Sequence, residues 1–194
     1  MFRLGLSLFT ILLLAGCAGK PQVTDSDKQN WLEMANNIKL IKTWSIEGKV
    51  GARNGDDATS FNIVWSQQGD EFSIRLFGPM GQGAISIYGD TDYAIMKQGE
   101  TSQQAGNLHE LMSQNSNLNL PLDHLTFWIR GIPSPETRAG IKVDHEGLLS
   151  EIKQDNWKVE YSEYYYDETP MPRKLNVSKA DMSAKIIIKE WSIE

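Results

Sequence analysis

Hydrophobic residues along this chain follow two different periods. Near the start they recur every three or four positions, at Trp31, Met34 or Ala35, Ile38 and Ile41. This spacing predicts one amphipathic helix of about four turns, which Asp25 or Ser26 would cap. After Thr43 the apolar residues alternate with polar ones, and this period of two predicts β-strands.

The alternating pattern divides into short strands separated by polar turn clusters. Before residue 106 the strands lie within residues 44–52, 61–65, 72–76, 84–88, 93–97 and 101–105. The hairpin-length turns between them imply an antiparallel meander. The eight inward-facing residues of the middle strands, taken as one face by the period-two rule, are Phe61, Ile63, Trp65, Phe72, Ile74, Leu76, Ile85 and Ile87.

The strand pattern then stops and later returns. Leu108, Leu111 and Met112 predict a short helix, and residues 121–129 predict a second one with Pro121 in its first turn and Gly131 just past its end. Strands resume at residues 141–145, 148–153, 157–161, 175–177 and 186–188, with breaks at 155–156, 169–172 and 181–183. Roughly ten strands in one domain must pack sheet on sheet or curl into a barrel, with the helices against the concave face. The fold class expected is mainly β (α+β).

One turn carries an unusual residue. The stretch "FGPMGQG", residues 77–83, joins two predicted strands, and Gly78-Pro79 and Gly81 are typical of a tight turn. Turns normally carry polar residues, yet Met80 is apolar. Two interpretations are open: Met80 folds back onto the sheet, or it is deliberately exposed.

The first twenty residues predict export. The pattern is that of a signal peptide: a basic residue (Arg3), an apolar run from Leu4 to Leu14 and small residues before Cys17. The apolar run is too short to span a bilayer permanently. Leu14 to Cys17 resembles the bacterial lipobox, which implies cleavage before Cys17 and its N-acyl and S-diacylglycerol modification; the alternative is an ordinary signal peptide with an incidental cysteine. Two or more acyl chains anchor a protein stably. Ala18 follows the cysteine, where Asp favours inner-membrane retention in similar lipoproteins, so we expect the periplasmic face of the outer membrane.

These patterns divide the chain into a signal peptide (1–16), a lipidated N-terminus with a small, polar tether (17–29) and a single domain (30–194). Cys17 is the single cysteine, so no internal disulfide is expected. The chain has 19 basic and 25 acidic residues, a formal net charge of −6, and is one unit more negative once Arg3 is removed. This balance argues against nucleic acid or anionic headgroups as the main partner. A monomer is expected.

Motifs for catalysis are missing from the sequence. It contains no G-x-S-x-G elbow, P-loop, H-E-x-x-H or pair of metal-spaced cysteines, so neither an enzyme, a metal site nor a cofactor is expected. The three histidines, His109, His124 and His145, are scattered over two predicted helices and a strand. A lipid-active hydrolase that uses one of them is one rival hypothesis. An apolar-lined fold without an evident reaction points instead to binding or transport.

Several segments, in order, resemble the LolB family, outer-membrane receptors that take lipoproteins from the periplasmic carrier LolA and insert them into the membrane. After the lipobox they are "WSIEGKVGAR" from Trp44, "FNIVWSQQGDEFSIRLFGPMGQG" from Phe61, "LPLDHLTFWIRGIPSP" from Leu120, "IKQDNWKVEYSEY" from Ile152, "MPRKLNV" from Met171 and "KIIIKEW" from Lys185. Together they extend over almost the whole chain.

The resemblance implies an unclosed antiparallel β-barrel whose helices cover a hydrophobic concave cavity that receives acyl chains. The eight inward residues given above would line it, although the same alternation also describes an ordinary core. Pro79, Met80 and Gly81 match a family loop with an exposed apolar residue, usually Leu, that probes the membrane. The partners implied are LolA, lipoprotein acyl chains and the inner leaflet of the outer membrane. A second rival is a structural lipoprotein of the outer-membrane assembly apparatus that binds protein instead of lipid.

Overall fold

The computed structural model describes residues 23–115 and 121–194. The predicted signal peptide and the lipidation of Cys17 lie outside these residues. No helix in the described part of the chain is both long and apolar enough to cross a membrane.

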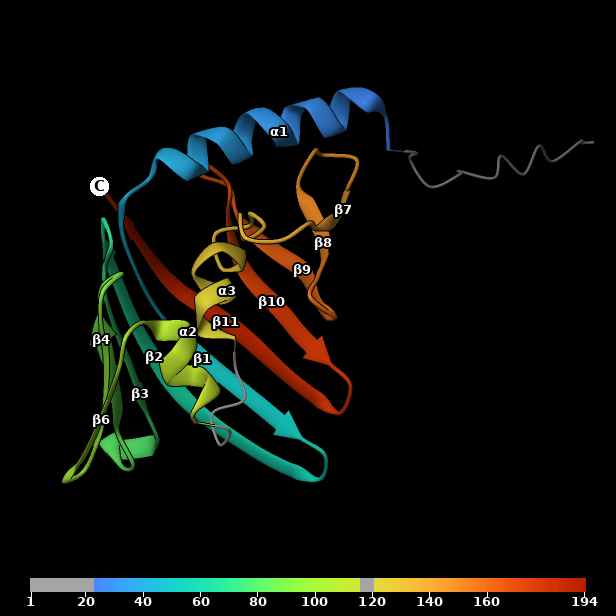
Figure 1. Cartoon of the computed structure of the whole chain (residues 1–194). Coiled ribbons are helices and arrows are strands. Elements are labelled where there is room, and N and C mark those ends of the chain that lie inside the picture. The colour runs from blue at the N-terminus through green and yellow to red at the C-terminus, as the bar shows by residue number, and fades with distance from the viewer. Residues whose placement is uncertain (1–22, 116–120) are drawn as a thin grey trace, which may run out of the picture.

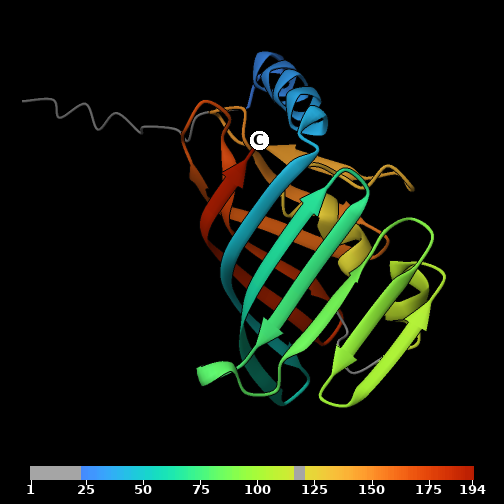
Figure 2. The same ribbon diagram turned by 90° about the vertical axis from the view of Figure 1, so that its left-hand side faces the viewer.

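The described residues fold into one antiparallel sheet of eleven strands that stays open between its edges (Figures 1 and 2). The strand order is β6-β5-β4-β3-β2-β1-β11-β10-β9-β8-β7. The strands are β1 (Thr43–Asn54), β2 (Asp57–Gln68), β3 (Glu71–Phe77), β4 (Ile85–Gly89), β5 (Ala94–Gln98), β6 (Thr101–Ala105), β7 (Gly140–Val143), β8 (Leu149–Gln154), β9 (Trp157–Tyr165), β10 (Met171–Lys179) and β11 (Met182–Ile193). The predicted mainly β, unclosed barrel-like fold is confirmed.

Two meanders meet at the pairing of β1 with β11. Every other neighbour in the sheet is also a neighbour in the sequence, whereas this pair joins the two ends of the domain, for example Trp44 with Ile193. The register shifts by one residue between Glu47 and Gly48. A Cβ on Gly48 would lie 2.5 Å from the carbonyl oxygen of Ile187, so the close approach of the two strands requires glycine here.

In residues 23–115 and 121–194, three α-helices cover the sheet. Helix α1 (Asp25–Leu40) lies across one end of it, and α2 (Leu108–Ser113) and α3 (Leu122–Trp128) lie on its concave side (Figure 1). Each helix buries its apolar stripe in the core: Trp31, Ala35 and Ile38 from α1, Leu108 and Leu111 from α2, Leu122, Leu125 and Trp128 from α3. The helix positions agree with the spacing of these residues along the chain.

The start of α1 corrects two sequence-based expectations. The N-cap is Thr24, not Asp25 or Ser26, because its side chain accepts from the backbone of Asp27 while the Asp27 carboxylate accepts from the backbone of Thr24. The helix therefore includes residues 25–29, where the predicted helix and the predicted tether overlap. Small polar residues suit a tether by composition, but the capping box makes the same residues a helix start.

Two of the predicted interruptions between strands, at residues 169–172 and 181–183, are shorter in the structure than in the prediction. Strand β10 begins at Met171 and contains Pro172, where a register shift against β9 accommodates the missing backbone donor. The turn before β11 is reduced to Ala180 and Asp181, and Met182 is already in the strand. Ala180 has a φ of 49°, which allows this tight connection.

Candidate functional site

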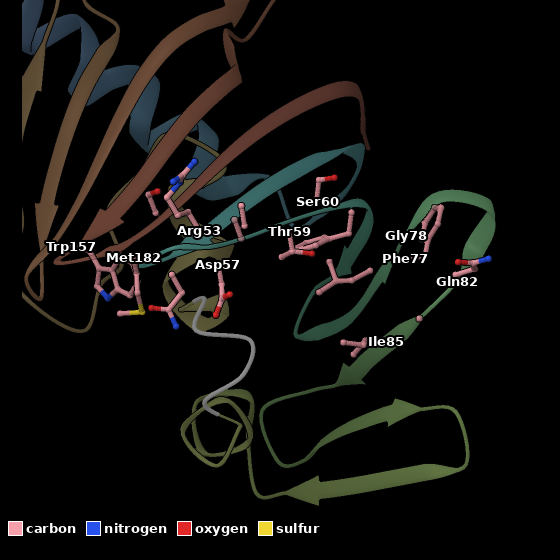
Figure 3. Close-up of a pocket in the computed structure, with 17 residues that line it drawn as sticks. Arg53, Asp57, Thr59, Ser60, Phe77, Gly78, Gln82, Ile85, Trp157 and Met182 are labelled. Carbon is pink, nitrogen blue, oxygen red and sulfur yellow. The ribbon is translucent and has the colours of Figure 1, made fainter.

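A cavity of about 770 Å³ opens at the end of the sheet away from α1 (Figure 3). Strands of both meanders contribute to its wall. In Figure 3, Trp157 and Met182 lie on one side, and Phe77, Gly78 and Gln82 on the other. Its lining residues are Ala52, Arg53, Asn54, Asp57, Ala58, Thr59, Ser60, Phe61, Leu76, Phe77, Gly78, Gln82, Gly83, Ile85, Trp157, Met182 and Ser183. This volume lies within the range of small-ligand sites, about 300–1,000 Å³.

The cavity has an apolar floor and a polar rim. Phe61, Leu76 and Ile85 come from adjacent strands, and Leu76 pairs directly with Ile85 in the register of β3 and β4. The rim is the β1–β2 hairpin, where Asn54 pairs with Asp57. A long apolar ligand would therefore contact hydrocarbon along its length and polar groups at the mouth.

Three of the eight residues predicted to line a cavity do so: Phe61, Leu76 and Ile85. Ile63, Trp65, Ile74 and Ile87 point to the same side of the sheet, but each is at most 3% exposed and belongs to the core. Phe72 lies beside a separate recess at the α1 end. The eight predicted residues therefore do not line one cavity, because in the described part of the chain helices cover the middle of the concave face and separate the cavity from the recess at the α1 end.

The sequence analysis missed the opposite wall of the cavity. Trp157 begins β9 and Met182 begins β11, so both follow the inward alternation of their strands. Their period-two spacing could have marked them as inward. Their proximity to Phe61 could not be read from the sequence, because it depends on the pairing of β1 with β11.

Met80 is exposed at the tip of its turn. Residues Pro79–Gly81 form a short 3₁₀ turn, and the Met80 side chain is 94% exposed, so it does not fold back onto the sheet. Its φ is 58°, which is uncommon for a residue with a Cβ. The Gly78 backbone N–H donates to the Gln82 carbonyl oxygen at 2.9 Å, which closes the loop. Gly78 and Gln82, which flank this turn, also line the cavity, so the Met80 turn adjoins the cavity wall.

Arg130 fastens α3 to the end of α1. Its guanidinium donates to the carbonyl oxygens of Thr126 (3.0 Å) and Ile41 (3.2 Å) and lies over the rings of Trp44 and Phe127. Ile41 is the C-cap of α1 and Thr126 belongs to the last turn of α3, so the cation lies at two helix C-termini, where positive charge is favoured. Burial lowers the pKa of the Arg130 guanidinium.

We expect Arg130→Ala to lower the free energy of unfolding by about 2 kcal/mol, because two hydrogen bonds from a charged donor are lost and two helix ends lose their cap. Urea denaturation followed by circular dichroism measures the change. Arg138→Ala is the matched control, because Arg138 is exposed in the loop that follows α3. Equal stability of the two variants would contradict the capping role of Arg130.

The inner helix α3 is also held by buried polar contacts. Trp128 Nε1 donates to Gln154 Oε1 at 2.8 Å, and the Tyr161 hydroxyl donates to the Trp128 carbonyl oxygen at 2.7 Å. Burial raises the pKa of Tyr161 well above its ordinary value, so its hydroxyl remains a donor. The helix is therefore fixed to β8 and β9 at its C-terminal end.

Each of the three histidines lies against a carboxylate. His109 Nδ1 is 2.7 Å from Asp123, His124 Nε2 is 3.4 Å from Asp155, and His145 Nε2 is 3.9 Å from the neighbouring Glu146. The hydrogen bond to Asp123 raises the pKa of His109. The cavity lining contains no histidine, so these side chains are not placed to attack a ligand there.

Comparison with known proteins agrees with the fold and with the sequence resemblance. The family model described as "Outer membrane lipoprotein LolB" matches residues 42–191. The outer-membrane lipoprotein LolB of Chromohalobacter salexigens is 31% identical and covers 98% of this chain and 91% of its own length. That of Stutzerimonas stutzeri is 32% identical, over 93% of this chain and 90% of its own. A crystal structure of a LolA superfamily protein from Nitrosomonas europaea superposes with a TM-score of 0.55 at 9% identity, over 86% of this chain and 93% of that one.

Proposed function

Because the chain belongs to the LolB family of outer-membrane lipoproteins, we propose that it receives lipoproteins at the outer membrane and inserts them there. The observation that supports this function is an open cavity with an apolar floor beside an exposed apolar turn. The cavity would hold the acyl chains of the lipoprotein, and Met80 would contact the bilayer during delivery. No covalent step is needed for such a transfer.

Transfer of a lipoprotein through water requires an apolar site that shields its acyl chains from water. Exposure of each CH₂ group costs about 0.8 kcal/mol, so a chain of many such groups stays covered at every stage. Phe61, Leu76 and Ile85 offer an apolar surface of the required kind. The bilayer is a larger apolar environment, so release becomes favourable once the mouth of the cavity meets it.

The immediate donor in this proposal is the periplasmic carrier LolA, which hands its lipoprotein to the receptor. Anchoring would come from Cys17, with N-acyl and S-diacylglycerol groups holding the domain on the periplasmic face of the outer membrane. The receptor would act as a monomer, and its net negative charge favours a carrier with a basic contact surface.

The test is transfer of a fluorescent lipoprotein from the carrier to the receptor. We expect Ile85→Asp to reduce acceptance at least about tenfold, because a carboxylate in the apolar floor must be desolvated when a chain enters. Gel filtration separates the two complexes and measures the transferred fraction. Val64→Asp is the matched control: Val64 is 36% exposed and lies on the opposite face of β2 from the inward residue Ile63.

Equal acceptance by native protein, Ile85→Asp and Val64→Asp would contradict a role for this cavity. The alternative function, a scaffold for outer-membrane assembly that binds protein, is not favoured by family membership. It would gain support if the purified receptor retained a peptide or a barrel protein and no acylated ligand. The remaining alternative, a hydrolase, is tested by replacement of His109, His124 and His145 together, after which transfer should be unchanged.

A further inference from the structure

A group of histidine and carboxylate side chains lies outside the cavity, on α3 and the loop that follows it. Asp123, His124 and Glu136 each offer one ligand atom, and these three atoms lie within 4.8 Å of one another. None of them lines the cavity, and the proposed transfer of acyl chains does not use them. We define these three residues as the α3 cluster.

Each α3 residue of the cluster is held by a further side chain. His109 Nδ1 lies 2.7 Å from one carboxylate oxygen of Asp123, which leaves the second oxygen of Asp123 available. On the other side, His124 Nε2 lies 3.4 Å from Asp155 Oδ2. Carboxylates and histidines that bind metals are normally oriented by such outer partners.

The second ring nitrogen of His124 lacks a partner. Its Nδ1 atom is buried and makes no hydrogen bond to any of residues 23–115 and 121–194. Buried polar atoms are usually paired, so an unpaired one needs an explanation. Asp155 lies 3.4 Å from Nε2, and a proton on Nε2 leaves Nδ1 with a lone pair; neutral imidazole is the form that binds metals. The ring is also fixed in place, since it stacks on Trp128 at 5.1 Å.

The loop that carries Glu136 is fixed by the neighbouring residue. Gln154 Nε2 donates to the Thr137 carbonyl oxygen at 2.9 Å, and the Thr137 hydroxyl donates to Asp155 Oδ2 at 2.6 Å. The backbone beside Glu136 is therefore held, while Glu136 itself is exposed.

We propose that the α3 cluster binds a divalent transition-metal ion, with Zn²⁺ as the ion that fits best. Zn²⁺ accepts one imidazole nitrogen and two carboxylate oxygens at about 2.0–2.2 Å, with water in an open position, so bound ligand atoms are about 3.4 Å apart. The three ligand atoms lie within 4.8 Å of one another, so they must approach by about 1 Å to reach this spacing. Ca²⁺ fits poorly because it requires six to eight oxygens. The ion would tie α3 to the loop before β7.

Isothermal titration of the untagged full chain in detergent, stripped of metal with a chelator, tests the site. We expect one equivalent of Zn²⁺ to bind, Ca²⁺ to give no signal, and saturating Zn²⁺ at about 100 times Kd to raise Tm by about 5–10 °C. Glu136→Ala should weaken binding at least about tenfold without a risk to folding, since Glu136 is exposed. His124→Asn should abolish binding, and Asp155→Asn should weaken it about 10–100-fold.

His145→Asn is the matched control, because His145 is an exposed histidine between β7 and β8 that does not belong to the α3 cluster. Its Zn²⁺ affinity should equal that of the native chain. Two results would overturn the proposal. The first is no binding at about 1 mM Zn²⁺, a concentration at which only a very weak site stays empty. The second is equally tight binding by the native chain, Glu136→Ala and His124→Asn, which would place the ion elsewhere.

Discussion

A receptor with Met80→Glu is expected to accept lipoprotein normally and to deliver it to phospholipid vesicles at least about tenfold more slowly than the native chain. Met80 is 94% exposed in the turn whose flanking residues Gly78 and Gln82 line the cavity, so the change leaves the core intact. An apolar side chain inserts favourably, whereas a charged one costs about 3 kcal/mol at the bilayer centre and less near the interface. Each 1.4 kcal/mol corresponds to a factor of about ten.

The measurement uses Cys17→Ala as the background, so that the lipid anchor does not mask the turn. Receptor loaded with a fluorescent lipoprotein is mixed with vesicles, and the fraction that floats with the vesicles is followed in time. Met80→Leu is the matched control: Leu, like Met and Glu, is unbranched at Cβ, so all three have a similar backbone cost at a φ of 58°. Delivery by Met80→Glu at the native rate would assign membrane contact to the anchor or to another surface.

Replacement of Gln154 by leucine is expected to cause the largest loss of stability, about 3–5 kcal/mol. The Gln154 amide is buried and makes hydrogen bonds at both ends. Its oxygen accepts from Trp128 Nε1 and from the Ser134 backbone at 3.1 Å, and its nitrogen donates to the carbonyl oxygens of Ser134 and Thr137. Leucine fills a similar volume but leaves these groups without partners, and each unpaired buried group costs about 1–3 kcal/mol.

Urea denaturation measures this change, and a lower midpoint with an unchanged slope would show that stability alone is affected. Gln104→Leu is the control for the same chemical change on an exposed strand position, and we expect it to be within about 0.5 kcal/mol of the native chain. If Gln154→Leu were as stable as Gln104→Leu, the buried amide would not be what holds α3 and its following loop to β8.

Met80 and Gln154 lie in parts of the molecule that differ in burial. The Met80 turn and the cavity rim are formed by exposed loops and hairpin ends, whereas α3 is fixed by buried hydrogen bonds to β8 and β9. A firmly held helix keeps the middle of the concave face closed. The cavity therefore lies at the end of the strands that these contacts do not cover.

The order and type of the elements followed from the sequence. Strand β3, for example, alternates exposed and buried residues as its pattern predicts, and α3 begins within one residue of the expected start at Pro121. The period of the hydrophobic residues is set within each segment, so it predicts a helix or a strand without knowledge of the tertiary contacts. The exposure of Met80 was one of two open interpretations, since glycine-flanked turns can bend either way.

Other features depended on tertiary structure. Trp157 and Phe61 meet at one cavity because β1 pairs with β11, and this contact joins residues more than a hundred positions apart. Phe61 and Ile63 have the same sequence signal, yet one lines the cavity and the other belongs to the core. The sequence by itself determined which side of each strand is apolar, and only the helices that pack against that side decided where it stays open.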